Sequence, residues 1–272
     1  MTKVKINKGD VIMPKKANAM LAEIRRQEML EIVNSEGRVT VNSLSKKFNV
    51  SPATIRADLS MMELDGLLKR AHGGALSIVK SDYELTSREK FGLHNEEKRA
   101  IARLAKNYVT PGAVIGIDTG TTTIEFAKQI LNIPNLTVIT NDLKIALMLE
   151  ERSSHTVILL GGSVRKSFHC TVGQSVIDSL DSFRINVSFL ATNAIDLDWG
   201  LSTPKLDVAN VKSKLIKNSK QTILLADSSK FGQDSLARFA NIKDVDVLIT
   251  DSKVDRKYTD AIQNMGVEVV TG

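Results

Sequence analysis

The chain has 272 residues, of which 42% are hydrophobic and 25% charged, the ordinary balance of a globular protein with room for one large or two average domains. A single cysteine, Cys170, excludes an internal disulfide. No segment has the residue order of a signal peptide or the roughly 18 apolar residues of a membrane span, so we expect a cytoplasmic protein without a membrane partner.

The net charge of +6 comes entirely from the first third of the chain. Residues 1–80 contain 14 Lys and Arg against 8 Asp and Glu, whereas residues 81–272 contain 23 of each. A basic N-terminal segment beside a neutral remainder favours a module that binds a polyanion such as nucleic acid. Residues 1–17 are polar and rich in lysine without an apolar period, which predicts a disordered basic tail.

Two helices are predicted at the start of a domain over residues 18–77. From Ala22 onward, apolar residues recur at near-helical spacing, and Gly37 gives a plausible end. Thr40 or Asn42 then caps a short helix with the sequence VNSLSKKF, whose apolar residues share one face.

A third helix is predicted from Ser51 to Gly66. Serine followed by Pro52 is a helix start, with the serine as N-cap and the proline at the first helical position. The apolar residues of this helix line one side, and the opposite side is small and polar with one arginine, Arg56. Such a face fits a DNA major groove, in which arginine reads guanine edges.

The segment LLKRAHGGA predicts a short basic hairpin that turns at Gly73 and Gly74. Three helices followed by a basic wing predict a winged helix-turn-helix, although the same pattern also suits a three-helix bundle that binds a protein partner. If the partner is double-stranded DNA, we expect its contacts to come from Thr40, Ser51, Pro52, Thr54, Arg56, Ser60, Lys69, Arg70, His72 and Gly73.

The exact amino-acid sequence of this region is more informative than its pattern of helices and hairpin. RRQEMLEIV and GRVTVNSLSKKFNVSPATIRADLSMMELDGLLKRAHGGA closely resemble the N-terminal DNA-binding module of DeoR-family transcriptional regulators. Members of that family usually carry a second basic residue after the arginine, where this chain has Ala57. That departure bears on one backbone or base contact and leaves the docking mode unchanged.

Residues 78–95 lack a clear period and predict a linker, and residues 96–272 predict an α/β domain. Short apolar runs there alternate with helix-length segments, which indicates a mostly parallel sheet with both faces covered. The predicted strands are Val114–Ile117, Leu136–Ile139, Val157–Leu160, Val187–Leu190, Ile223–Leu225, Val245–Ile249 and Val267–Val270.

Polar residues follow most of these strands, at the edge of the sheet where ligands collect in such folds. The segment GIDTGTT, before Ile124, looks like the first phosphate loop of ATP-dependent sugar kinases. In those enzymes a second strand follows, whereas here Ile124, Ala127 and Leu131 share a helical face. The loop is therefore predicted to be a helix N-terminus that holds phosphate with backbone N–H groups and hydroxyls.

The motifs EEKRAIARLA, IDTGTTTIEFA, LTVITND, VILLGGSVR, VGQSV, GLSTP and ILLADSSKFG resemble, in order, the C-terminal domain of the DeoR family. The resemblance implies a fold related to ribose-phosphate isomerases and a phosphorylated sugar as effector. Carried over by position, it implies that the effector contacts Asp118, Gly120, Thr121, Thr122, Thr123, Asn141, Gly162, Asn193, Lys212 and Lys230.

Two departures from the family pattern matter: Asn193 replaces a common aspartate, and Val208 replaces an acidic residue often found four places before Lys212. Isomerases and deaminases need carboxylates to move a proton between carbons, which Asn193 cannot do. We therefore expect no enzyme activity, with a sugar-phosphate isomerase or deaminase as the alternative. His72, His94, His155 and His169 are too widely spaced for a metal site, and no cofactor is expected.

The combined reading is a DNA-binding regulator, most simply a repressor of a sugar uptake or catabolism operon, whose operator binding responds to a phosphorylated sugar. We expect a homo-oligomer, a dimer or tetramer, because one recognition helix and wing cover only half of a two-fold operator.

Overall fold

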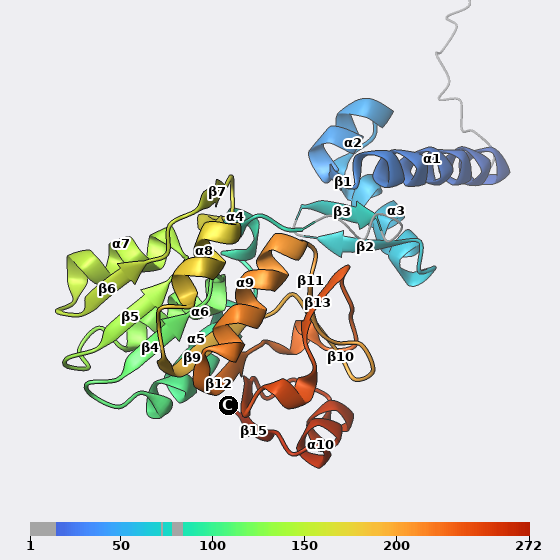
Figure 1. Ribbon diagram of the computed structural model, residues 1–272. Coiled ribbons are helices and arrows are strands. Elements are labelled where there is room, and N and C mark those ends of the chain that lie inside the picture. Colours follow the sequence, from blue (N-terminus) through green and yellow to red (C-terminus); the bar gives the residue numbers. More distant parts are fainter. Residues whose placement is uncertain (1–14, 72, 78–83) are drawn as a thin grey trace, which may run out of the picture. The chain divides into compact units, whose positions relative to one another are not determined.

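The computed structural model describes residues 15–71, 73–77 and 84–272 (Figure 1). The chain divides into two compact units, Met1–Tyr83 and Glu84–Gly272. Within the described residues, no helix combines the length and the apolar character needed to cross a membrane. The predicted order of a small helical domain followed by an α/β domain is confirmed.

The smaller unit contains three helices and a three-stranded antiparallel sheet. The helices are α1 (Lys15–Glu36), α2 (Val41–Phe48) and α3 (Pro52–Leu64), and the strands β1 (Arg38–Thr40), β2 (Leu68–Ala71) and β3 (Gly74–Ser77) pair in the order β1-β3-β2. The predicted caps are confirmed: Thr40 caps α2 in a capping box, and the Ser51 hydroxyl accepts a hydrogen bond from the Thr54 N–H. Of the predicted tail, residues 1–14 lie outside the described residues, and α1 already includes the rest.

The core of the smaller unit joins α1 to α3. Met29 and Val33 of α1 and Ile55 and Leu59 of α3 are fully buried together. The strand β1 is not predicted from the sequence, and its pairing with β3 depends on Gly74. A Cβ atom on Gly74 would lie 1.8 Å from the carbonyl oxygen of the β1 residue Val39, so only glycine allows the two strands to pair there.

The larger unit is built on a seven-stranded parallel sheet with the order β15-β14-β12-β9-β4-β5-β6. Each of the seven predicted strands lies in it. Their bounds are β4 (Val114–Ile117), β5 (Thr137–Thr140), β6 (Thr156–Leu159), β9 (Ile185–Ala191), β12 (Ser219–Leu225), β14 (Val247–Thr250) and β15 (Glu268–Thr271).

Helices cover both faces of this sheet, as predicted (Figure 1). On one face, α5 (Asn95–Ala105), α6 (Thr121–Gln129) and α7 (Leu143–Arg152) pack on β4, β5 and β9 through a core that includes Phe126 and Phe189. On the other face lie α8 (Gln174–Leu180), α9 (Leu206–Lys217) and α10 (Arg256–Asn264). The sequence pattern anticipates this because strands covered on both faces form nearly continuous apolar runs.

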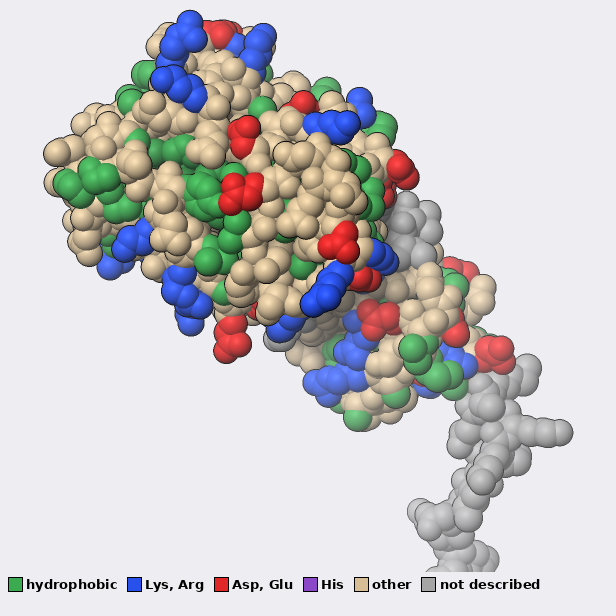
Figure 2. Space-filling view, turned by 90° about the horizontal axis from the view of Figure 1, so that it is seen from below, with side chains coloured by type: hydrophobic (Ala, Val, Ile, Leu, Met, Phe, Trp, Pro, Cys, Tyr) green, Lys and Arg blue, Asp and Glu red, His purple; other side chains and the backbone are tan. Residues whose placement is uncertain are grey.

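Smaller elements complete the larger unit. An antiparallel pair is formed by β7 (Ser163–Arg165) and β8 (Cys170–Val172), and a second sheet by β10 (Ala194–Asp196), β11 (Gly200–Thr203) and β13 (Ala237–Ala240). Three single turns of 3-10 helix are η1 (Lys106–Tyr108), η2 (Ser228–Lys230) and η3 (Ile242–Asp244). On the face of the larger unit shown in Figure 2, acidic and basic side chains are interspersed, in keeping with its balanced charge.

The structure differs from the sequence prediction at the linker. Residues 78–83 lie outside the described residues, but residues 84–95 belong to the larger unit and contain the short helix α4 (Ser87–Lys90). Ser87 donates two hydrogen bonds, from its N–H to the Ser167 carbonyl and from its hydroxyl to the Phe168 carbonyl. These anchors lie about 80 residues further along the chain, so no local sequence pattern reveals them.

Candidate functional site

The sheet of the larger unit has a topological switch point between β4 and β9. From β4 the chain adds β5 and β6 on one side, and from β9 it adds β12, β14 and β15 on the other. In open parallel sheets, ligands bind in the crevice beyond the carboxyl ends of the two strands at this point. Here those ends lead into Asp118 and into Thr192 and Asn193.

Asp118 and Lys212 link the two loops at the switch point. The Lys212 ammonium on α9 donates to the Asp118 carboxylate and, at 2.8 Å, to the carbonyl oxygen of Ala191. The Ala191 N–H donates to the same carboxylate oxygen at 3.2 Å. The two charged side chains are at most 3% exposed, so the pair is buried. Buried charges persist in proteins when they are paired and hydrogen-bonded in this way.

The helix α6 begins at this point without a side-chain cap. Its N-cap residue, Gly120, has no side chain to bond the N–H groups of the first turn, in contrast to α2, α3 and α7, which Thr40, Ser51 and Asp142 cap. A Cβ atom on Gly120 would lie 2.9 Å from the Ala191 Cβ, so glycine permits the close approach of the two loops. An open helix N-terminus offers N–H groups and a partial positive charge to an anion.

The three threonines of this loop are all buried, but they are not equivalent. The hydroxyl of Thr123 donates to the Gly120 carbonyl at 2.9 Å, so its hydrogen is engaged within the loop. Thr121 and Thr122 are 8% and 6% exposed, whereas Thr123 is fully buried. The predicted contacts of Thr121 and Thr122 therefore fit a ligand better than a hydroxyl contact from Thr123.

Three buried carboxylate or amide oxygens at this edge of the sheet have no hydrogen-bond partner among the described residues. They are Asp118 Oδ1, Asn141 Oδ1 and Asp227 Oδ2, which follow β4, β5 and β12. Buried polar atoms in native proteins are almost always satisfied, so acceptors of this kind call for donors from a bound molecule or from water. The Asn141 amide is fixed by its Nδ2, which donates to the Thr171 carbonyl at 2.9 Å.

Four lysine side chains lie near these acceptors: Lys212 and Lys230, which are predicted from the sequence, and Lys90 and Lys98, which are not. Lys230 lies on η2, with its ammonium 3.8 Å from Asp227 Oδ2. Burial lowers the pKa of Lys90, and the nearby charges of Lys230 and Lys212 lower it further. Lys98 is 4% exposed and donates to the carbonyl oxygens of Lys90 and Leu93.

Burial also lowers the pKa of Lys98, to about 8, with further lowering by the charges of Lys230 and Lys90. The segment EEKRAIARLA reads as an amphipathic helix, and Lys98 lies on its polar side, which normally faces solvent. The residues around α4 cover it instead, and this covering segment is part of the predicted linker.

Two other predicted residues have different surroundings. Asn193 accepts a hydrogen bond from the Thr203 hydroxyl at 3.0 Å and donates to Glu84 at 3.3 Å, so it lies among polar groups. At Gly162, a Cβ atom would lie 2.7 Å from both the Val172 carbonyl oxygen and the Val176 side chain. The close packing of Gly162 against β8 and α8 therefore explains why a glycine occupies this position.

The predicted DNA-binding residues that the structure describes are exposed or half-buried in the smaller unit. Ser51, Pro52 and Arg56 of the α3 region are exposed, and Lys69 and Gly73 are exposed on the wing. Thr40 is exposed at its cap, and His72 lies outside the described residues. The Ser51 and Thr54 hydroxyls hydrogen-bond to each other at 2.9 Å.

The wing is tied to α3 by Arg70. Its guanidinium donates to the Ser60 hydroxyl at 2.7 Å, and its backbone N–H donates to the Glu63 carboxylate at 2.7 Å. Ser60 in turn donates to the carbonyl oxygen of Arg56. Arg70 and Ser60 thus fix the wing against the helix, which holds the two predicted DNA-contacting elements in one geometry.

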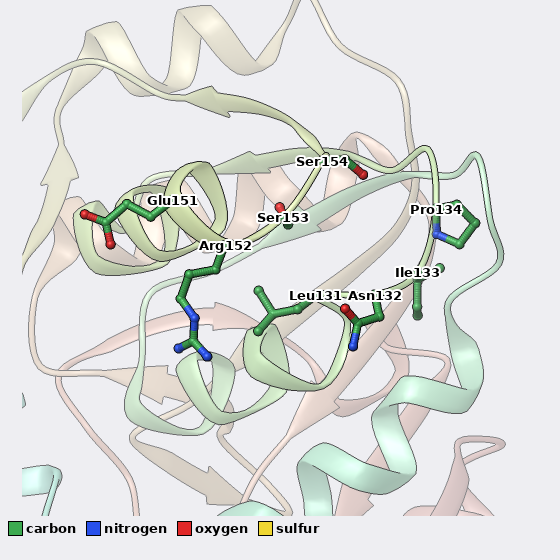
Figure 3. A pocket seen from close by; sticks show the side chains of 8 residues that line it. All are labelled: Leu131, Asn132, Ile133, Pro134, Glu151, Arg152, Ser153 and Ser154. Carbon is green, nitrogen blue, oxygen red and sulfur yellow. The ribbon is translucent and has the colours of Figure 1, made fainter.

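An open hollow with a volume of about 530 Å³ lies elsewhere in the larger unit (Figure 3). Its lining comes from the loop before β5, including Leu131 and Pro134, and from the end of α7, including Glu151 and Arg152. Both segments precede their strands, so the hollow lies at the edge of the sheet opposite to Asp118. Among the described residues, no group of His, Cys, Asp and Glu side chains could hold a metal ion.

Comparison with known proteins agrees with this architecture. Residues 25–81 match the DeoR-like helix-turn-helix domain, and residues 93–252 match the DeoR C terminal sensor domain. The chain is 35% identical to the HTH-type transcriptional regulator GlpR of Haloferax volcanii over 93% of this chain and 99% of that protein. It is 32% identical to the glycerol-3-phosphate regulon repressor of Escherichia coli over 84% of this chain and 90% of that protein.

Among solved structures, a D-ribose-5-phosphate isomerase in complex with phospho-erythronic acid aligns with a TM-score of 0.38 and 19% identity, covering 50% of this chain and 53% of the isomerase. The two domain matches and the near full-length relatives decide the classification. The relatives are transcriptional regulators, and this chain belongs to the DeoR family of transcriptional regulators.

Proposed function

We propose that the protein is a repressor that binds operator DNA through α3 and the wing, and that a phosphorylated sugar bound at the carboxyl ends of β4, β9 and β12 changes this binding. The protein acts as a homo-oligomer, since one α3 helix reads only half of a two-fold operator. The sugar changes DNA binding because it has unequal affinity for the DNA-competent and DNA-incompetent arrangements.

The observation that supports the effector assignment is that groups suited to a phosphate and groups suited to hydroxyls lie at the same edge of the sheet. The open N-terminus of α6 and the lysines Lys90, Lys212 and Lys230 suit a phosphate. The buried oxygens of Asp118 and Asp227 repel a phosphate but accept hydrogen bonds from hydroxyl groups. A molecule with a phosphate at one end and hydroxyls along its length satisfies both sets.

The names of the relatives support the same class of ligand. One relative is a glycerol-3-phosphate regulon repressor, and glycerol 3-phosphate is itself a phosphorylated polyol. The DNA assignment is supported by the exposed small and polar face of α3 and by the excess of basic residues in the first 80 positions.

The larger unit is proposed to bind its sugar phosphate without turnover. Asn193 stands where a carboxylate would be needed, and its amide cannot act as a general base. A general base must be free to take a proton from the substrate. A coupled assay for isomerisation or deamination of the bound sugar phosphate is expected to show no product.

The test is a thermal-shift panel of sugar phosphates, with the corresponding free sugars and ATP as controls. A true effector at a hundred times its dissociation constant adds about 2.7 kcal/mol to the free energy of unfolding. The compound that stabilises the protein should then change its affinity for DNA fragments selected by the protein from a random pool. Stabilisation by free sugars or by ATP to the same extent would contradict the effector assignment.

A further inference from the structure

Glu84 is the first residue of the larger unit, and its carboxylate is surrounded by donors from three separate segments. Oε1 accepts hydrogen bonds from Lys90 Nζ at 2.9 Å and from Asn193 Nδ2 at 3.3 Å. Oε2 accepts from Arg165 Nη2 of β7 at 2.8 Å. The Glu84 side chain is only 7% exposed, so the carboxylate fills an enclosed position.

The three donors are also held by neighbours other than Glu84. The Arg165 guanidinium lies 3.8 Å from the centre of the Phe168 ring, and the Lys90 ammonium lies 5.8 Å from the same ring. The Asn193 amide oxygen accepts from the Thr203 hydroxyl at 3.0 Å. The donors are therefore arranged by packing and hydrogen bonds that would persist if another acceptor stood in place of the carboxylate.

The charges at this position favour an anion. Within the described residues, Glu84 is the only carboxylate that forms an ion pair with Lys90 or Arg165. Burial alone would raise the pKa of Glu84, but the charges and hydrogen bonds of Lys90 and Arg165 outweigh burial and lower it, which keeps the group ionised. Asn193, one of the three donors, follows β9 at the switch point of the sheet, so the position adjoins the candidate effector site.

The position is also linked to Lys98 of α5, a helix that packs against α6. Lys98 donates to the carbonyl oxygen of Lys90, and its ammonium is affected by the charges of both Lys90 and the α6 residue Glu125. Lys98 thus connects the donors around Glu84 with Lys230 of the candidate effector site.

We propose that Lys90, Arg165 and Asn193 form an anion-binding subsite, that Glu84 occupies it in the free protein, and that the phosphate of the effector displaces Glu84. The identity of the displacing group as the phosphate of a sugar rests on the proposed function. A phosphate offers the same charged oxygen acceptors as a carboxylate, with one more of them, and suits a bidentate arginine.

Displacement gives the ligand a physical route to the DNA-binding unit. Because Glu84 begins the larger unit, its release frees the chain at the boundary between the two units. A ligand that binds only the arrangement with Glu84 released has unequal affinity for the two arrangements, as regulation requires.

The test uses the full-length Glu84→Ala protein and inorganic phosphate, followed by thermal shift. Without the internal competitor, the phosphate concentration for a half-maximal shift should fall about 10-fold relative to the unchanged protein. Acetate, which replaces the missing carboxylate, should stabilise Glu84→Ala and leave the unchanged protein unaffected. The double variant Glu84→Ala with Arg165→Gln should lose both the stronger response to phosphate and the stabilisation by acetate.

Glu97→Ala is the matched control, because Glu97 also pairs with a lysine, Lys253, but outside this cluster. Its phosphate response should equal that of the unchanged protein, which also corrects for general salt effects. Glu84→Gln keeps the size of the side chain and should shift the response in the same direction by less. Glu84→Gln replaces Glu84→Ala in the experiment if Glu84→Ala does not fold.

Phosphate and acetate responses in the Glu84 variants equal to those of the unchanged protein would overturn the subsite, as would gains that survive Arg165→Gln. A sugar phosphate that binds the unchanged protein and Glu84→Ala equally would leave the effector assignment intact but remove the displacement. Gains for inorganic phosphate without binding of any sugar phosphate would uphold the subsite and count against the sugar as effector.

Discussion

Lys212 of α9 forms a buried ion pair with Asp118, the residue after β4, although 94 residues separate them in the chain. The same ammonium bonds the Ala191 carbonyl at the end of β9. One side chain therefore joins the ends of both strands at the switch point of the sheet. The pair sets the spacing of the loops between which the effector is proposed to bind.

Replacing Lys212 with methionine should destabilise the larger unit strongly, because Asp118 would remain buried without a counter-charge. Breaking a buried pair in this way costs about 3–5 kcal/mol. The double variant Lys212→Met with Asp118→Asn removes both charges and should recover much of the loss. Urea denaturation measures the three free energies of unfolding, and a double variant no more stable than the single one would contradict the role of the pair.

Gly120→Val should abolish the response to the effector while leaving DNA affinity close to normal. The Cβ atom of any side chain at position 120 would lie 2.9 Å from the Ala191 Cβ. The larger valine side chain must therefore displace the loop at the start of α6. Gly161→Ala is the control, since it lies at the same edge of the sheet and its Cβ would meet no atom within 4 Å. An effector that still releases Gly120→Val from DNA would place the site elsewhere.

Lys98 should make the stability of the protein depend on pH in the alkaline range. Its pKa is about 8 in the folded protein and near its ordinary value of 10.5 in the unfolded chain. Between these values the unfolded chain binds more protons, so the free energy of unfolding rises with pH. The penalty for the buried charge is complete below about pH 8 and is relieved as the pH rises towards 10.5.

The measurement is chemical denaturation at several pH values between about 7.5 and 9.5, with Lys98→Met as the reference. The unchanged protein should gain more stability over this range than the variant does. Parallel curves for the two proteins would show that Lys98 does not titrate in this range.

The parts of the fold that could be predicted are those with local signals. The start of α3 follows from Ser51 and Pro52, because a serine cap and a proline at the first position satisfy or avoid unpaired N–H groups. The predicted strand Val114–Ile117 coincides with β4, because a strand buried on both faces is continuously apolar. The prediction that a helix begins at the Gly120 loop is confirmed for a related reason, because the residues after the loop keep helical spacing.

The parts that could not be predicted depend on contacts between distant residues. Glu84 looks like one more charge in a polar segment, and only the folded chain brings Arg165, 81 residues away, into contact with it. Lys98 lies on the polar side of α5, and its burial results from the backbone of Lys90 and Leu93. Secondary-structure periodicity carries no information on such pairings.

Arg56→Ala should weaken binding to the operator by about 1–3 kcal/mol if the exposed guanidinium reads a base, and the loss should be confined to the cognate sequence. If Arg56 instead contacts a phosphate, affinity should fall on all duplexes, and the salt dependence of binding should become shallower. Fluorescence anisotropy at several salt concentrations separates the two cases. Lys220→Ala removes the same charge from an exposed position of the larger unit and should leave binding unchanged. Because α3 has a single arginine, flanked by Ala57, equal affinity of Arg56→Ala and the unchanged protein for every duplex would mean that α3 does not recognise DNA through a basic side chain.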